Sequence, residues 1–203
     1  MRELTGASAT TAATALRGSG IAAFNIDPAE LRDDQAASAA AAITAAFASA
    51  VAVGGTKNSL NINITPVMFE AGFDGLSAND KANMVFDEWE VNGSFEFVEF
   101  SKANLDKVLM NTTGTDIGNG LSEIVPVESC VPEFISNVAF RVNVMDCGQT
   151  VPAILVIYNA LSTDGISLAT GTRQINSLPV SFKGHYDTTG ETQPFGIFIP
   201  TPA

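Results

Sequence analysis

Residues 88–97 read EWEVNGSFEF, and this stretch decides the fold class because its apolar and polar residues alternate with a period of two. Successive side chains of a strand point to opposite faces, whereas a helix would scatter these apolar residues around its surface. One face would carry the apolar side chains of Trp89, Val91, Phe95 and Phe97. The other face would carry Glu88, Glu90, Asn92, Ser94 and Glu96. The pattern therefore predicts a β-strand with one buried face and one polar face.

Similar patterns elsewhere predict a mostly-β chain. Six further segments are expected to be strands: residues 21–26, 60–64, 134–145, 153–158, 178–182 and 195–199. Residues 153–158 are continuously apolar, which is typical of a strand that is buried on both faces. Pro66 is expected to end the strand over residues 60–64, because proline cannot donate to a sheet ladder. In the strand over residues 134–145, three polar side chains are expected to face water: Asn137, Arg141 and Asn143.

Two segments between the strands are predicted to be loops. Phe73-Asp74-Gly75 indicates a turn, and the polar residues 77–83 extend it into a surface loop. The Gly- and Thr-rich residues 111–120 are also expected to form a loop.

An Ala-rich segment over residues 28–53 is expected to be helical. Asp27 would cap the helix, Pro28 suits its first position, and Gly54-Gly55 would end it. Its apolar stripe would be Ile43, Phe47 and Val51, at spacings of four residues. The open alternative is that this segment is partly extended.

A second, shorter helix is predicted over residues 101–110, with Ser101 as its cap. Three apolar side chains would share its packed face: Leu105, Val108 and Leu109. The predicted organisation is therefore one β domain over residues 21–203, preceded by a flexible arm over residues 1–20. The 18 uncharged residues 36–53 are mostly small, so neither a membrane span nor an export signal is expected.

The charge balance narrows the function. Lys and Arg number 10 against 22 Asp and Glu, giving a net charge of −12, which opposes binding to phosphate backbones and makes a sequence-reading nucleic-acid binder improbable. Charged residues make up only 16%, below the roughly 25% of an ordinary soluble domain. This shortage suggests that much of the surface meets protein, and the acidity alone would also serve solubility.

Residues that could support catalysis or bind a metal are few. The only histidine, His185, lies beside a turn and is expected to be a surface or interface residue. No His or Cys pair has the spacing of zinc ligands, and in residues 111–123 the position of Ile117 breaks a calcium-loop match. Cys130 and Cys147 bracket a strand of roughly 40 Å, so both are expected to be reduced. No enzyme, metal or cofactor is therefore expected.

The order of these features resembles the tail tube, or major tail, proteins of long-tailed bacteriophages. Six segments carry the resemblance: Gly54-Gly55-Thr56-Lys57 before a strand, Phe73-Asp74-Gly75, the strand over residues 89–97, the helix over residues 101–110, and the two ends over residues 20–28 and 195–200. The resemblance implies a β-sandwich or barrel with one packed α-helix that forms hexameric rings. The rings would stack into a tube in the virion tail, and genome DNA would pass through it.

The resemblance also implies where the acids lie and which proteins the chain meets. Glu88, Glu90 and Glu96 become candidates for the inner wall, where negative charge would repel DNA, although the same residues could face solvent. The partners would be other copies of the chain, a tape-measure protein and tail-end proteins, after synthesis in the host cytoplasm.

Two other functions remain open. The chain could be another self-associating β-sandwich subunit, such as a different virion component or a surface-layer or pilus-like protein. It could also be a glycan-active or glycan-binding module that uses paired carboxylates of the strand over residues 88–97. Trp89 argues against the glycan module, because the only Trp would lie on the face opposite the acids.

Overall fold

The computed structural model describes residues 21–33, 35–36, 38–53, 56–70, 84–98, 101–146, 149–164, 177–187, 189 and 192–199. Its elements, in chain order, are β1 (Ile21–Phe24), the 3-10 helix η1 (Glu30–Arg32), α2 (Ala39–Ala46), β2 (Val51–Ala52), β3 (Thr56–Glu70), β4 (Met84–Phe97), α3 (Lys102–Val108), β5 (Thr112–Gly118), β6 (Leu121–Pro126), β7 (Ile135–Asp146), β8 (Gln149–Ser162), β9 (Leu178–Lys183) and β10 (Phe195–Phe198). The prediction of a mostly-β chain is confirmed, and the paired strands run antiparallel.

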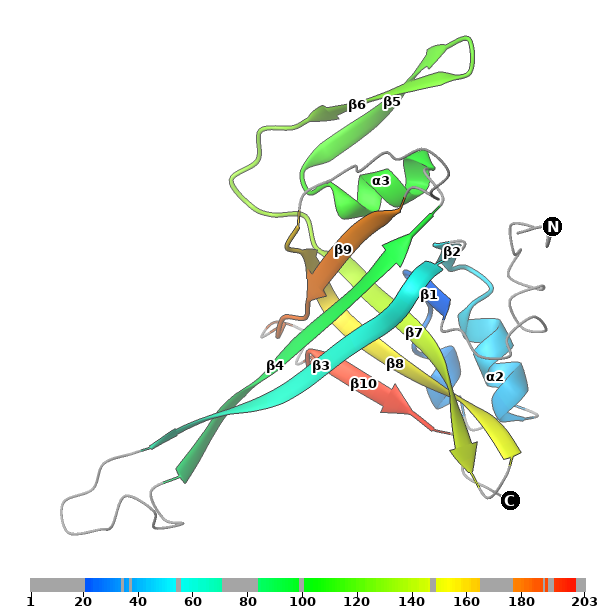
Figure 1. Cartoon of the computed structure of the whole chain (residues 1–203), viewed down its shortest axis with the longest axis vertical. Coiled ribbons are helices and arrows are strands. Elements are labelled where there is room, and N and C mark those ends of the chain that lie inside the picture. Colours follow the sequence, from blue (N-terminus) through cyan, green and yellow to red (C-terminus); the bar gives the residue numbers. More distant parts are fainter. Residues whose placement is uncertain are drawn as a thin grey trace.

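The strands form two main sheets that share β8 (Figure 1). Sheet A contains β2, β1, β7, β8 and β10. Sheet B contains β3, β4, β9 and the last two residues of β8, Leu161 and Ser162. β5 and β6 pair only with each other and form a separate hairpin, the arm at the top of Figure 1.

β8 crosses from sheet A to sheet B at a bend around Asn159. Tyr158 still pairs with Asn137 of β7, whereas Leu161 pairs with Lys183 of β9. Asn159 lies between them with φ 46°, in the left-handed region that asparagine tolerates better than other non-glycine residues. Its side-chain amide donates to the carbonyl oxygen of His185 at 3.2 Å. Such bends are the usual way in which one strand joins two packed sheets.

The main core lies between the two sheets and is rich in phenylalanine. Phe24 and Phe140 of sheet A meet Phe95 and Phe182 of sheet B, with ring centroids 5.6–5.8 Å apart. Gly93 of β4 marks the closest approach, because a Cβ at this position would lie 2.7 Å from the Ile157 Cδ1 atom. The apolar face of β4 therefore packs as its alternation predicts.

A second core covers the opposite face of sheet A. Ile26 and Ile43 from the N-terminal segment pack there against Ala139, Ile154 and Val156 of β7 and β8. β8 is thus buried on both faces, which explains why residues 153–158 are continuously apolar.

The second core corrects the predicted exposure of Asn137. This residue was expected to face water, but its side chain is only 4% exposed. Its Oδ1 accepts from the Ile26 backbone N at 2.9 Å, and its Nδ2 donates to the Ile26 carbonyl oxygen at 3.0 Å. Arg141 is half-buried, and burial lowers the pKa of its guanidinium.

The prediction of one long helix over the Ala-rich segment is wrong in extent. The turn that begins at Asp27 yields only η1, because Asp33 returns to an extended conformation with ψ 110°. α2 begins later, after Ser38, whose Oγ accepts from the Ala41 backbone N at 3.2 Å. Ser38 therefore caps the helix in place of Asp27.

The end of the Ala-rich segment confirms the alternative of a partly extended chain. α2 ends at Ala46, and Val51 lies in β2, which pairs with β1. Ile43 and Phe47 pack on sheet A as the predicted stripe requires. Val51 instead packs on the core between the sheets.

Two further boundaries differ from the prediction. β3 continues through Pro66 to Glu70, because it is an edge strand and proline is tolerated where the N–H would point away from the sheet. The predicted loop over residues 111–120 is instead part of the β5–β6 hairpin, whose turn carries Asn119 at φ 54° and Gly120 at φ 73°. Polar strands with no apolar face give little periodic signal.

The predicted short helix is confirmed as α3. Ser101 caps it by accepting from the Asn104 backbone N at 3.2 Å, and Val108 is 1% exposed. Asn104 is buried as well, and its Nδ2 donates to the carbonyl oxygen of Val53 at 3.0 Å. α3 is therefore attached to the sandwich beside β2.

Several predicted features lie outside the described residues. They are the arm over residues 1–20, the stop at Gly54-Gly55, the turn at residues 73–75, the loop over residues 77–83, and Cys147. Cys130 is exposed with a free thiol.

Candidate functional site: the polar face of sheet B

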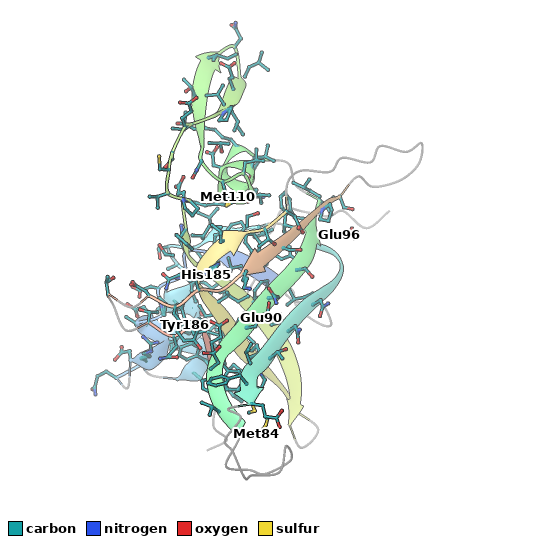
Figure 2. All side chains as sticks on the ribbon, turned by 90° about the vertical axis from the view of Figure 1, so that its left-hand side faces the viewer. Met84, Glu90, Glu96, Met110, His185 and Tyr186 are labelled. Atoms are coloured by element: carbon teal, nitrogen blue, oxygen red, sulfur yellow. The ribbon has the colours of Figure 1, made fainter. Side chains whose placement is uncertain are left out.

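One face of sheet B carries polar side chains from three adjacent strands. β4 places Glu88, Glu90, Asn92, Ser94 and Glu96 on this face, opposite the core residues of the same strand. β3 adds Asn61, Asn63 and Thr65, and β9 adds Ser181 and Lys183. The predicted grouping of the three glutamates on one face is present, and Figure 2 shows Glu96 and Glu90 along the same strand.

Hydrogen bonds hold two of the three glutamates. Glu90 Oε1 lies 3.2 Å from the Lys183 ammonium on the adjacent strand. The hydrogen bond from Lys183 is the main cause that lowers the pKa of Glu90, and Asn92 contributes in the same direction. Glu96 accepts from the Ser177 hydroxyl at 2.6 Å. The face is therefore less acidic than the sequence suggested, because Lys183 partly neutralises it.

The centre of this face is a shallow hollow lined by amides and hydroxyls. Its walls come from Asn61, Asn63, Asn92, Ser94, Thr163 and Ser181. Over the described parts of the chain, no helix or strand packs on this face (Figure 2). Such a surface presents many weak hydrogen-bonding groups and little charge.

β3 is the outer strand of sheet B. Its 15 residues pair with β4 on one side, and none of the described strands pairs with its other side. At the other side of sheet B, β9 pairs with β8 only at its end, through Lys183 and Phe182. An exposed strand edge is a template for pairing with another chain, and natural proteins rarely leave a long one open.

His185 and Tyr186 lie next to this face, at the end of β9. The His185 ring meets the edge of Phe134 at 5.4 Å, and the Tyr186 hydroxyl accepts from the Trp89 backbone N at 2.7 Å. The predicted placement of His185 is thus half right, since the ring is half-buried. Burial is the main cause that lowers the pKa of His185, Lys183 adds to the effect, and Glu88 opposes it.

We expect the imidazole of His185 to titrate below about 6.5, its ordinary pKa. The unfolded chain then takes up a proton that the folded chain refuses, so the free energy of unfolding should fall as the pH drops below about 6.5. NMR titration of the chain's single histidine measures the midpoint directly. His185→Gln should remove this part of the pH dependence, and a midpoint above 6.5 would contradict the prediction.

Comparison with known proteins adds no assignment: neither a family model nor a curated protein matches the chain. Among the described residues, no helix is both long and apolar enough to span a bilayer. The same residues bring no three His, Cys, Asp or Glu side chains together in a way that could hold a metal ion.

Sequence reasoning missed two features of the site. It did not pair Lys183 with Glu90, because the two residues are far apart in sequence and only the order of β4 and β9 brings them together. It also ended β3 at Pro66 and so missed the length of the free edge. Pro66 itself was the available signal, since proline inside a strand pattern indicates an edge.

Proposed function

We propose that this chain is the tail tube subunit of a long-tailed bacteriophage, a structural protein without catalytic activity. Copies would join edge to edge through sheet B into a ring, and the resemblance of the sequence to this family sets the number of copies at six. The rings would stack into a tube through which genome DNA passes.

The free edge of β3 is the observation that carries this proposal. A ring needs two different edges on each copy, one that offers a strand and one that receives it. β3 offers one edge, and the part of β9 beyond its short pairing with β8 offers the other. Joining them between neighbours would continue sheet B around a closed barrel, which leaves no edge exposed.

The polar face of sheet B suits the wall of such a channel. Its described cation, Lys183, is paired with Glu90, so phosphates would find no unpaired ammonium there. Glu88 and Glu96 add negative charge, and the remaining side chains are amides and hydroxyls. DNA would slide past without the counterion release that gives tight binding.

Ile64→Pro should prevent ring formation, and Ile64→Ala is its matched control. Ile64 shares the strand phase of Pro66 and pairs with Val91, so its N–H is expected to point to the free edge. Both variants lose the same partly buried side chain. Only proline also removes the N–H that would bond to a neighbour.

Sedimentation velocity and negative-stain microscopy at high protein concentration measure the outcome, and circular dichroism verifies folding. We expect rings from the parent chain and the Ile64→Ala variant, and monomers from the Ile64→Pro variant. A parent chain that stays monomeric at all concentrations would sink the proposal. A folded Ile64→Pro variant that still forms rings would exclude the β3 edge as the contact.

A further inference from the structure

Exposed large apolar side chains gather at two ends of the molecule. Of the 14 such residues in the described chain, 11 fall into two groups. The tip surface, at the far end of the β3–β4 hairpin, consists of Met68, Phe69, Met84, Val85 and Phe86. The arm surface, on the β5–β6 hairpin and its flanks, consists of Met110, Ile117, Leu121, Val127, Val131 and Phe134. Single exposed apolar residues are ordinary, but gathered ones indicate an interaction site.

A β-bulge shapes the tip surface. Val67 pairs with Glu88 and Met68 pairs with Phe86, so Asp87 is an extra residue that reverses the alternation of β4. Phe86 therefore joins the face of Trp89, and their rings lie 5.6 Å apart. Trp89 in turn meets Phe195 at 5.6 Å, which ties the hairpin to sheet A. Without the bulge, Phe86 would continue the polar face of Glu88 and Glu90.

The arm surface belongs to a hairpin that lacks a core of its own. β5 and β6 form a two-stranded sheet, and such a sheet is marginally stable unless it packs on something else. Its inner face meets α3, where Gly114 lies against Lys102 and Asp106. The side chains next to its turn remain open, with Ile117 57% and Leu121 62% exposed.

The two surfaces lie at opposite ends of the chain. In Figure 1, viewed with the longest axis vertical, the β5–β6 arm is at the top and the end of the β3–β4 hairpin is at the lower left. Figure 2 agrees after a quarter turn, with Met110 high and Met84 at the bottom. Two such ends on one chain define a direction along which copies can follow one another.

We propose that the tip surface of one copy docks on the arm surface of the next copy along this axis. A contact between two different surfaces of identical chains repeats without closing, so every tip and every arm is covered except at the two ends of a stack. A tip-to-tip contact would leave the arms uncovered. The inference rests on the proposed function and names the contact between successive rings.

The charges of the two surfaces predict how this contact responds to salt. Residues 111–134 contain Asp116, Glu123, Glu128 and Glu133 and no Lys or Arg. The strand ends of the tip carry Glu70, Asp87 and Glu88, again with no cation in residues 66–70 and 84–88. Apolar contact must therefore overcome like-charge repulsion, which salt screens. Stacking should strengthen with ionic strength, whereas ion pairs would weaken.

Mixing two variants tests the contact. Phe86→Glu places a charge on the tip, and Leu121→Glu places one on the arm. Each variant alone should need about tenfold more protein to form stacks, the loss expected for a central interface residue. An equal mixture should form pairs of rings but no long stacks, because one intact tip of the arm variant still meets one intact arm of the tip variant.

Matched controls separate this contact from folding and from ring formation. Ile197→Glu changes a residue of similar exposure, 52%, that belongs to neither surface, and it should stack like the parent chain. Met84→Glu repeats the tip test at a residue that is 50% exposed, in case Phe86→Glu disturbs Trp89. Circular dichroism and single-ring microscopy monitor each variant.

The outcomes divide cleanly. Loss of stacking in each variant, with paired rings in the mixture, supports the contact. Normal stacking by either folded variant, or a mixture without paired rings, would overturn it. Parent rings that form but never stack, at any salt concentration, would overturn this contact and leave the edge-to-edge ring intact. A parent chain that forms no rings at all would overturn both.

Discussion

Phe182→Ala is expected to lower the free energy of unfolding by about 3–5 kcal/mol. The ring is 1% exposed and lies between Phe24, at 5.6 Å, and Phe95, at 5.8 Å. Truncation removes contacts to both sheets at once, and β-sheet backbones relax little to fill the cavity. Urea unfolding followed by circular dichroism measures the change, and the midpoint should fall while the slope stays constant.

Phe69→Ala is the matched control for Phe182. It removes the same side chain from a position that is 50% exposed on the tip surface. Its effect on the free energy of unfolding of the monomer should stay within about 0.5 kcal/mol, as for most surface positions. Equal losses in the two variants would show that Phe182 does not join the sheets in solution.

Asn137→Ala is expected to cost about 2–5 kcal/mol. Its side chain makes two hydrogen bonds to the backbone of Ile26, and the site is too buried for water to replace them freely. Each unsatisfied buried group costs about 1–3 kcal/mol. Thermal unfolding measured by calorimetry should shift by several degrees or more.

Asn63→Ala provides the comparison for Asn137, because it removes an amide from the exposed face of β3. We expect it to change the free energy of unfolding by no more than about 0.5 kcal/mol. A similarly small effect of Asn137→Ala would contradict the role of Asn137 as the link between β7 and the segment after β1.

Much of the sandwich could be predicted from the sequence because burial imposes a period. Trp89, Val91, Phe95 and Phe97 reveal the face of β4 that meets the core, and the glutamates reveal its opposite face. The same rule placed β7, β8, β9 and β10 within a few residues of their ends, and the Ser101 cap placed α3.

The errors occur where local sequence carries no such period. The Ala-rich segment has high helix propensity throughout, but pairing with β1 pulls Val51 into a strand. Asn137 looks like a surface residue until the N-terminal segment covers it. The β5–β6 hairpin has no buried face of its own, so nothing in its sequence distinguishes it from a loop.

The candidate site was predictable only in part for the same reason. The grouping of Glu88, Glu90 and Glu96 follows from their spacing within one strand. Which strands flank β4 depends on distant pairings, and these bring Lys183 to Glu90 and leave β3 at the edge. The bulge at Asp87 was equally invisible, because it depends on the register between two strands.

The pairing of β1 with β7 also bears on how the chain is made. Ile21 pairs with Arg141, so a ribosome must add about 120 residues after β1 before its partner strand exists. At roughly 5–20 residues per second, this delay is on the order of 10 s. During that time the apolar residues of β1 have no strand to pair with, and the sandwich cannot close around them. Nascent chains would therefore be most vulnerable to aggregation until β7 leaves the exit tunnel, and chaperone capture should concentrate in that interval.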